Sequence, residues 1–278
     1  MQIAVAIIQA RQQLSASESA NLDAELLLCY VLGCERTYLY TYPEQELTPE
    51  DNESFNKLIA LRLEGHPIAH LIQKKEFWSM DFLITPDTLI PRPETEIIVD
   101  AALKLIPKIS DFSILDLGTG AGAIAIAIAS ERPEAIITAS DINNDTLTVA
   151  KKNAKANNIY NITFKQGNWF DIKEIDSYDL IVSNPPYISV NDLHLEQDDV
   201  RFESRTALVS GEKGLDDIKK IVVNARNYLN KNGWLLIEHG YQQGEAVRDL
   251  FSENKFNNVS TINDYSALER ATMGQWTA

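Results

Sequence analysis

This sequence of 278 residues has little cysteine, little histidine, a deficit of basic charge and no long apolar run. Its two cysteines, Cys29 and Cys34, are too few for a disulfide framework and do not form a C-x-x-C pair, so we expect free thiols. The four histidines lack the spacing of metal ligands, and the sequence predicts no metal site.

Membrane and export signals are missing as well. No run of about 18 apolar residues occurs, which predicts that the chain does not enter a membrane. The N-terminal segment MQIAVAIIQARQQLSAS has no basic stretch ahead of its apolar residues, so no signal peptide is expected. These absences predict a cytoplasmic protein, and we expect it to be a monomer.

Basic charge is in deficit, because 25 Lys and Arg face 40 Asp and Glu for a net charge of −15. A protein that holds duplex DNA or RNA through its phosphates needs a basic face. The balance therefore argues against a dedicated nucleic-acid binder, although a local basic patch is compatible with it. Hydrophobic residues make up 45% of the chain, which is ordinary for a globular protein with a substantial core.

Residues 1–75 have helical periodicity and no strand-like segment. Apolar residues recur at helical spacing from Ile3 to Leu14, and a second helix is expected to end near Gly33. The tripeptide Thr48-Pro49-Glu50 has the pattern of a helix N-terminus. This part of the chain is predicted to form a small helical domain.

The residue pattern of the sequence changes after residue 75. Residues 76–90 are aromatic and β-branched around Pro86-Asp87, which predicts a hairpin or an extended linker. In the segment PRPETE, at 91–96, Pro93 is placed to open a helix.

Strand and helix patterns then alternate to the end of the chain, within a domain predicted over 91–278. The short apolar runs are typical of parallel strands that are covered on both faces. They predict an α/β doubly wound sheet. The expected strands are 113–117, 135–140, 161–165, 179–183, 233–238, about 257–262 and about 270–277.

A glycine-rich segment follows the first of these strands. Gly118-Thr119-Gly120-Ala121-Gly122 lies between strand 113–117 and an apolar helix, where an open α/β sheet binds its ligand. The next strand ends in Asp141, whose carboxylate can accept hydrogen bonds from two ribose hydroxyls. The pattern predicts a nucleoside cofactor. The loop formally fits a dinucleotide, and its G-x-G-x-G form after the acidic Asp116 fits S-adenosylmethionine at least as well.

A third segment points to an adenine ring. Asn168 and Trp169 follow strand 161–165, where a polar side chain can meet the adenine amino group and an aromatic one can line its pocket. A purely structural role in the core is an equal alternative for Trp169.

The segment VSNPPYIS, at 182–189, ends the fourth expected strand on the cofactor side. Asn184 offers a carbonyl oxygen, and the two prolines stiffen the loop so that the Pro185 carbonyl is a second fixed acceptor. Tyr187 adds a flat face for stacking. This arrangement suits a planar NH₂ group, because fixed acceptors orient it and stabilise the positive charge that develops when its nitrogen attacks an electrophile. The cofactor pattern of the glycine-rich segment and the acceptors of this segment together predict N-methylation by S-adenosylmethionine.

Asn184-Pro185-Pro186-Tyr187 is similar to the N-P-P-Y motif of methyltransferases that act on adenine, cytosine, guanine or glutamine. Other segments narrow the choice: PRPETE at 91–96, LDLGTGAGAIA at 115–125, DVRFE at 199–203 and LLIEHGYQQGEAVR at 235–248. In this combination the chain resembles, over nearly its whole length, the bacterial peptide-chain release factor glutamine methyltransferases.

The resemblance implies a seven-stranded, Rossmann-like S-adenosylmethionine-dependent methyltransferase sheet, preceded by a helical domain that grips the substrate. It implies methylation of the side-chain amide of the glutamine in the Gly-Gly-Gln motif of class 1 release factors, without a nucleic-acid or membrane partner. Carried over by motif, the catalytic residues are Asn184, Pro185 and Tyr187, which hold the glutamine amide together with Pro186. The cofactor-binding residues are Gly118, Thr119, Gly120, Ala121, Gly122, Asp141, Asn168, Trp169 and Asn184.

Three positions depart from the family pattern. Ala121 stands where Thr or Ser is frequent, Asn168 where Asp is usual, and Ser204-Arg205 where Pro-Leu is usual. Arg92 in PRPETE is compatible with facing the active site or with anchoring its loop.

Two rival functions stay open from the sequence. One is an amino-group methyltransferase acting on a flipped base of nucleic acid, against which the net charge of −15 argues. The other is a methyltransferase-fold adaptor without activity. The intact cofactor pattern and the intact N-P-P-Y segment argue against it.

Overall fold

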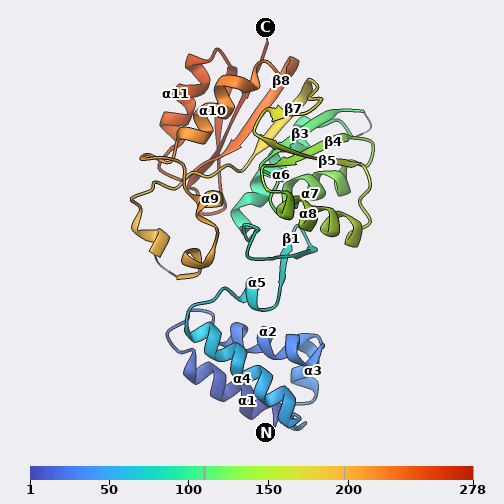
Figure 1. Ribbon diagram of the computed structural model, residues 1–278, viewed down its shortest axis with the longest axis vertical. Helices are drawn as coiled ribbons and strands as arrows, with labels where there is room; N and C mark the ends of the chain where they lie inside the picture. Colours follow the sequence, from blue (N-terminus) through green and yellow to red (C-terminus); the bar gives the residue numbers. More distant parts are fainter. Residues whose placement is uncertain (109–110, 197, 278) are drawn as a thin grey trace. The chain divides into compact units, whose positions relative to one another are not determined.

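The computed structural model describes residues 1–108, 111–196 and 198–277 (Figure 1). The chain divides into two compact units. One comprises Met1–Lys74 with His194–Phe202, and the other comprises Lys75–Leu193 with Glu203–Ala278. The sequence predicts one domain over 91–278, whereas in the structure segment 194–202 belongs to the helical unit.

The first unit is a small helical bundle, with a core that includes the fully buried Ile3, Leu27 and Phe55. Thr48 caps a helix by accepting the N–H of Asp51 at 3.1 Å, as the sequence predicts. Two of the helices, of six and four residues, are too short to show periodicity, and sequence reasoning missed them. The helices are α1 (Ile3–Gln13), α2 (Ala20–Leu32), α3 (Arg36–Thr41), α4 (Pro49–Leu63) and α5 (Ile68–Leu71).

Segment 194–202 is held within the helical unit by a largely buried arginine, Arg62. The guanidinium of Arg62 contacts Asp23 at 2.9 Å and Asp199 at 2.6 Å, and its side chain is only 14% exposed. The ring of Phe202 lies 4.1 Å, centroid to centroid, from that of His66. The chain thus leaves the larger unit soon after the N-P-P-Y segment and returns to it at Glu203.

Strands β1 (Lys74–Phe77) and β2 (Met80–Leu83) form a two-stranded sheet. Their turn is made by Trp78 and Ser79, with φ values of 53° and 56°. A two-residue hairpin loop of this kind needs positive φ at both central residues, and glycine or asparagine is its usual sequence signal. Because Trp-Ser gives no such signal, the sequence pattern placed the break at Pro86-Asp87 instead.

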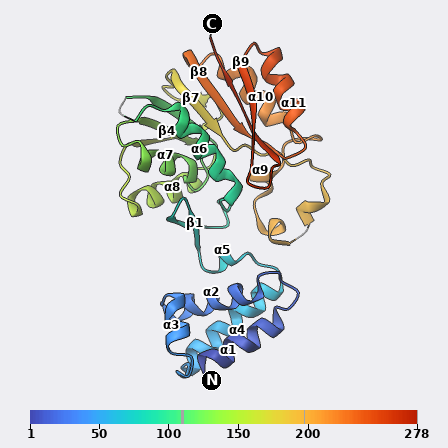
Figure 2. The same cartoon turned by 180° about the vertical axis from the view of Figure 1, so that it is seen from behind.

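The larger unit is built on a mixed sheet, which Figure 2 shows from behind. Among the described residues its strands run in the order β6-β5-β4-β3-β7-β8-β10-β9. Strand β10 is antiparallel to β8 and β9, whereas β3, β4, β5, β7 and β8 pair in parallel. The strands are β3 (Ser113–Leu117), β4 (Ile136–Asp141), β5 (Ile162–Asn168), β6 (Asp171–Ile172), β7 (Tyr178–Ser183), β8 (Leu229–Glu238), β9 (Asn257–Asn263) and β10 (Glu269–Gln275).

All seven strands expected from the sequence form, which confirms the fold class. The additional strand β6 has two residues and pairs with the end of β5. A 3₁₀ turn, η1 (Pro93–Thr95), opens α6 (Glu96–Leu105) at the position where Pro93 predicts a helix start. Helices α6, α7 (Ala123–Glu131) and α8 (Asn144–Ala156) pack against the central strands.

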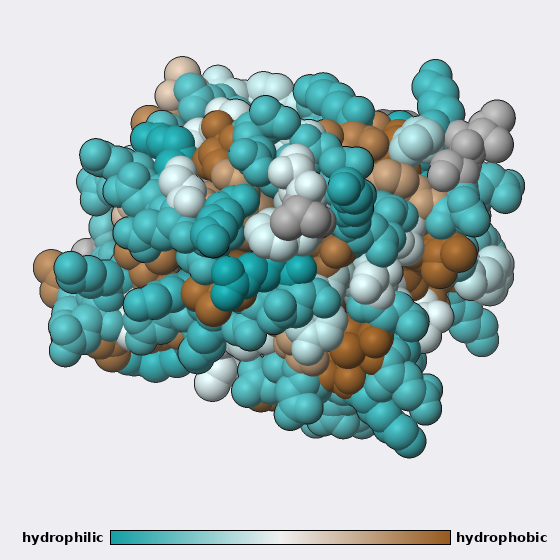
Figure 3. All heavy atoms as spheres, turned by 90° about the horizontal axis from the view of Figure 1, so that it is seen from above, coloured by the Kyte–Doolittle hydropathy of each residue, from teal (hydrophilic) through white to brown (hydrophobic). Residues whose placement is uncertain are grey.

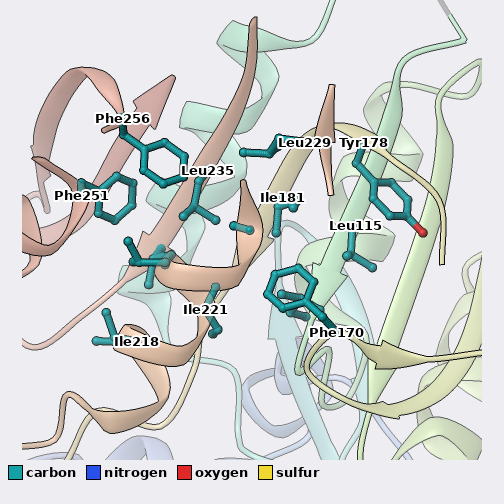
Figure 4. Close-up of a cluster of buried hydrophobic side chains, with 14 of the residues drawn as sticks. Leu115, Phe170, Tyr178, Ile181, Ile218, Ile221, Leu229, Leu235, Phe251 and Phe256 are labelled. Carbon is teal, nitrogen blue, oxygen red and sulfur yellow. The ribbon is translucent and has the colours of Figure 1, made fainter. Parts of the chain in front are cut away.

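One face of the sheet is covered by α10 (Asp216–Ala225) and α11 (Gly244–Glu253). In Figure 4, Leu115, Ile181 and Leu235 of three neighbouring strands meet Ile221 and Phe251 of these helices, and all five are fully buried. Successive residues of a strand point to opposite faces. Burial of this set therefore fixes the register of the strands.

That register brings three strand ends together. Leu117 at the end of β3 pairs with Ser140 of β4 and with Ser183 of β7. The residues that follow, Gly118, Asp141 and Asn184, consequently lie at one edge of the sheet.

Across the described residues, every helix is too short or too polar to span a lipid bilayer. The face seen in Figure 3 is mostly hydrophilic, with hydrophobic side chains in small separate patches. Cys29 and Cys34 are free thiols, as predicted.

Candidate functional site

A cavity of about 360 Å³ lies at the carboxyl edge of the sheet in the larger unit. This volume is within the range of small-molecule sites. The cavity is where residues from four separately predicted segments meet. Those that line it are Gly118, Gly120, Asp141, Asn168, Trp169, Asn184 and Pro186.

Asp141 organises the glycine-rich side of the cavity. Its Oδ2 accepts the N–H of Gly120 at 3.0 Å, and its Oδ1 accepts the N–H of Asn143 at 3.0 Å. Burial raises the pKa of Asp141, and these backbone hydrogen bonds oppose that rise. Since a carboxylate has about four lone-pair sites, Asp141 keeps acceptor capacity for hydroxyl groups of a ligand in the cavity.

Thr119, Ala121 and Gly122 belong to the same loop but are not among the lining residues. The Thr119 hydroxyl donates to Asp116 at 2.6 Å, and the Ala121 carbonyl accepts from Asn153 at 2.8 Å. Gly122 has a φ of 88°, a left-handed conformation that glycine adopts at little cost. These residues shape the loop, and their direct contact with a cofactor stays a prediction.

Trp169 lines the cavity and also packs against the hydrophobic core, and its contact with an adenine ring stays a prediction. Its ring lies so close to Gly118 that a Cβ there would be 3.3 Å from it. The indole N–H donates to Asp217 at 3.2 Å. Burial would raise the pKa of Asp217, but hydrogen bonds from Ser210, Lys220 and Trp169 lower it, which keeps the carboxylate ionised as an acceptor.

Sequence reasoning missed part of the cavity wall. The signal for Asn143 was available, because it follows the strand that ends in Asp141 and caps α8 by accepting from Asp145 at 2.9 Å. No motif of the sequence analysis includes the lining residues between 206 and 220, and Ser204 is named there only as a departure from the family pattern. The missed lining residues are Asp87, Leu89, Ile142, Asn143, Thr146, Ser204, Thr206, Ala207, Asp217 and Lys220.

Asn184 has the most informative hydrogen bonding in the site. Its Nδ2 donates to the Thr95 hydroxyl at 3.2 Å, whereas its Oδ1 is buried without a hydrogen-bond partner among the described residues. A buried acceptor left unpaired costs about 1–3 kcal/mol. Such an atom at a cavity is expected where a ligand supplies the donor. Pro185 and Tyr187 are not among the lining residues, and their contact with a substrate also stays a prediction.

Contacts from Gln243 and Gly214 hold the backbone beside Asn184 rigidly. Gln243 donates through Nε2 to the Tyr187 carbonyl at 3.0 Å. Gly214, with a φ of 69°, comes so close that a Cβ would lie 2.0 Å from the same carbonyl oxygen. The Tyr187 hydroxyl donates to Glu238 at 3.4 Å. Burial raises the pKa of Tyr187, so the phenol stays neutral.

Arg92 serves as an anchor. It forms an ion pair with Glu203, whose side chain is fully buried and also accepts the N–H of Ile90 at 3.1 Å. Of the two roles left open by the sequence, the structure shows the one that fastens the PRPETE loop. Across the described residues, no group of three or more His, Cys, Asp or Glu is placed to hold a metal ion.

Comparison with known proteins agrees with this geometry. Residues 6–72 match the PrmC N-terminal domain, and residues 108–276 match a methyltransferase domain. The chain is 49% identical over 265 residues to a release factor glutamine methyltransferase of Aliivibrio fischeri, covering 95% of this chain and 93% of that protein. It is 47% identical over 268 residues to that of Escherichia coli, covering 96% of each. Among solved structures, a methyltransferase from Pyrococcus furiosus shares the fold, with a TM-score of 0.55 and 18% identity over 79% of this chain and 98% of that one.

The buried Asp116 gives the site a testable pH dependence. Burial raises its pKa from 3.8 to about 7. Between these values the unfolded chain has lost the proton that the folded protein keeps, so this group's contribution to stability falls as the pH rises. Asp116→Asn does not titrate. Its free energy of unfolding should therefore improve relative to wild type by about 1–3 kcal/mol between about pH 5 and about pH 8.

Chemical denaturation at the two pH values measures this difference. Asp145→Asn, at an exposed carboxylate in the first turn of α8, is the matched control and should show little change with pH. If the free energies of unfolding of wild type and Asp116→Asn differed by the same amount at both pH values, the raised pKa of Asp116 would be contradicted.

Proposed function

Since this chain belongs to the release factor glutamine methyltransferase family, we propose that it transfers a methyl group from S-adenosylmethionine to the glutamine of the Gly-Gly-Gln motif in class 1 peptide-chain release factors. The product is N5-methylglutamine. The observation that carries the proposal is the unpaired, buried Oδ1 of Asn184 at the edge of a cavity of cofactor size. An amide N–H of the substrate supplies the donor that this oxygen lacks.

The residues of the cavity fit the cofactor. S-adenosylmethionine supplies an electrophilic methyl group when it is bound. Asp141 would accept hydrogen bonds from its ribose hydroxyls with the lone pairs that the loop leaves unused. Trp169 would line the adenine pocket, where Asn168 offers a carbonyl oxygen to the amino group. Gly118 and Gly120 keep the loop free of side chains at the wall of the cavity.

Around the glutamine, the chain orients a poorly nucleophilic nitrogen. The Oδ1 of Asn184 would accept one amide N–H and the carbonyl of Pro185 the other, while Tyr187 stacks on the amide plane. As the nitrogen attacks, it becomes tetrahedral and positively charged, which strengthens both hydrogen bonds. The N–H becomes acidic only during transfer, so we assign no general base that must act first.

We also propose that the helical unit docks the release factor. Residues 194–202, which follow the N-P-P-Y motif in the chain, belong to this unit. A release factor bound to the unit would therefore be held close in sequence to the motif. We further propose that the protein acts as a monomer. We place its action in the cytoplasm, where release factors work.

Methyl transfer to a release factor tests the function. Wild type with S-adenosylmethionine should add one methyl group, which mass spectrometry locates on the glutamine of the Gly-Gly-Gln motif. Asn184→Ala removes an acceptor whose effect grows with the charge on nitrogen. The single-turnover rate constant should fall about 10²–10³-fold. Asn184→Asp keeps an acceptor oxygen and should lose less.

The comparison arms are duplex DNA, ribosomal RNA and release factor in the same assay. Methylation of nucleic acid in preference to release factor would contradict the substrate assignment. A rate constant for Asn184→Ala within about threefold of wild type would show that another group holds the amide.

Cofactor binding is tested at Asp141. Asp141→Ala removes acceptors for two hydroxyl groups, and the affinity for S-adenosylmethionine should fall about 30–1000-fold, which corresponds to about 2–4 kcal/mol. Calorimetry on the isolated protein measures this loss. Asp145→Ala changes the same charge nearby and should bind like wild type. Equal affinities for wild type and Asp141→Ala would rule out the ribose assignment.

Docking by the helical unit is tested by comparing the KM for a short peptide substrate with the KM for intact release factor. A short Gly-Gly-Gln peptide fills the amide site without reaching a second unit. Intact release factor should have a KM lower by at least about tenfold, since linked contacts add to affinity. Steady-state kinetics on both substrates measures this ratio, and equal KM values would contradict docking.

A further inference from the structure

Helix α8 presents three polar side chains along one of its faces. Thr146, Asn153 and Asn157 are seven and four positions apart, a spacing that places them on the same side of a helix. Each of them donates a hydrogen bond to a backbone carbonyl of segment 81–89, which contains the end of β2 and the residues after it. In the same order, the acceptors are the carbonyls of Asp87 at 2.9 Å, Leu83 at 3.1 Å and Asp81 at 3.0 Å.

Segment 81–89 forms part of the wall of the cavity. Asp87 and Leu89 line it, and so does Thr146 of α8. The hydrogen bond from Thr146 to the Asp87 carbonyl therefore joins two residues of the wall. Since α8 also packs against β2, this part of the wall is fastened to the helix along the length of the segment.

The same face of α8 holds the glycine-rich loop. Gly122 lies so close to the helix that a Cβ there would be 3.2 Å from the Cβ of Ala150, which is fully buried. Ala150 lies between Thr146 and Asn153 on this face, and its small side chain permits the close approach. Asn153 donates through Nδ2 to the Ala121 carbonyl at 2.8 Å. Helix α8 thus contacts both the loop and segment 81–89.

One side chain, that of Asn153, binds both segments. Its Oδ1 accepts the N–H of Leu83 at 2.7 Å, and its Nδ2 donates to the carbonyls of Leu83 and Ala121. A backbone N–H can only donate and a carbonyl can only accept, so these partners fix which way the amide points. The side chain is 1% exposed. A buried amide paired in this way is held rigidly, because turning it would leave several buried groups unpaired.

We propose that Asn153 is a positioning residue for cofactor binding, which holds the glycine-rich loop and segment 81–89 in a fixed relation to each other. This role rests on the cofactor proposed above. Asn153 is not among the residues that line the cavity, so it acts through the backbone of the two segments. With both parts of the wall in place beforehand, S-adenosylmethionine does not have to order them when it binds. Asparagine is a weaker helix former than alanine or leucine, and these contacts explain its place inside α8.

The first test is Asn153→Asp, which keeps the shape and the acceptor for the Leu83 N–H but turns a carboxylate oxygen toward two carbonyls. The affinity for S-adenosylmethionine, measured by calorimetry, should fall about 10–100-fold. At saturating cofactor, the rate constant for methyl transfer and the KM for release factor should stay within about threefold of wild type. A residue that only stabilised the fold would lower the midpoint of unfolding and leave the affinity of the folded protein unchanged.

Asn153→Ala is the second variant, because it removes all three hydrogen bonds without burying a charge, and its affinity should fall to a similar extent. Asn161→Asp is the matched control. Asn161 donates through Nδ2 to the carbonyls of Arg132 at 3.3 Å and Ala135 at 3.1 Å, at the amino ends of the strands and away from the cavity. It should keep its affinity within about threefold of wild type. An affinity that close to wild type in either folded Asn153 variant would overturn the proposal.

Hydrogen exchange of backbone amides, followed by NMR without any ligand, separates this role from the proposed function. The N–H of Gly122, which donates to the Thr119 carbonyl at 2.9 Å, should exchange faster in both Asn153 variants than in wild type. The N–H of Leu83 should stay slow in Asn153→Asp, which keeps its acceptor, and become faster in Asn153→Ala. Asn161→Asp should change neither. Unchanged exchange of Gly122 in both Asn153 variants overturns the proposal, whereas a wild type that binds no S-adenosylmethionine counts against the proposed function.

Discussion

The hydrogen bond from Asn184 Nδ2 to the Thr95 hydroxyl is the contact on which the amide site depends. It occupies the donor end of the side chain and leaves Oδ1 at the cavity without a protein partner among the described residues. Its geometry needs two separate segments to be in place. The strand β7 must deliver Asn184 to the sheet edge, and the turn that Pro93 opens must deliver Thr95 opposite it.

The same sheet edge joins this contact to the other half of the site. Parallel pairing of β3 with β4 and β7 places the glycine loop between Asp141 and Asn184. Asp141 binds the loop through Gly120, and Gly214 and Gln243 fix the backbone of the N-P-P-Y segment. A methyl donor and an acceptor nitrogen have to meet at a set distance and angle, and rigid support of both walls is the physical condition for that.

Much of this was predictable from the sequence, because it rests on local signals. Periodicity and turn chemistry predicted all seven long strands, and the motifs predicted Gly118, Asp141 and Asn184 at one edge. The parts that were missed depend on packing between distant segments. Thr95 and Asn184 are 89 positions apart, and Tyr187 and Glu238 are 51 apart. The return of 194–202 to the helical unit, through Arg62 and Asp199, spans 137 positions. No local pattern marks such pairs.

A crystal structure of the enzyme with a cofactor analogue that carries no transferable methyl group, bound to a Gly-Gly-Gln peptide, would show which atoms hold the glutamine amide. The glutamine amide nitrogen should lie about 3 Å from both Asn184 Oδ1 and the Pro185 carbonyl oxygen, with Asn184 Nδ2 still bound to Thr95. A glutamine nitrogen farther than about 4 Å from Asn184 Oδ1, or an Asn184 amide turned over, would contradict it.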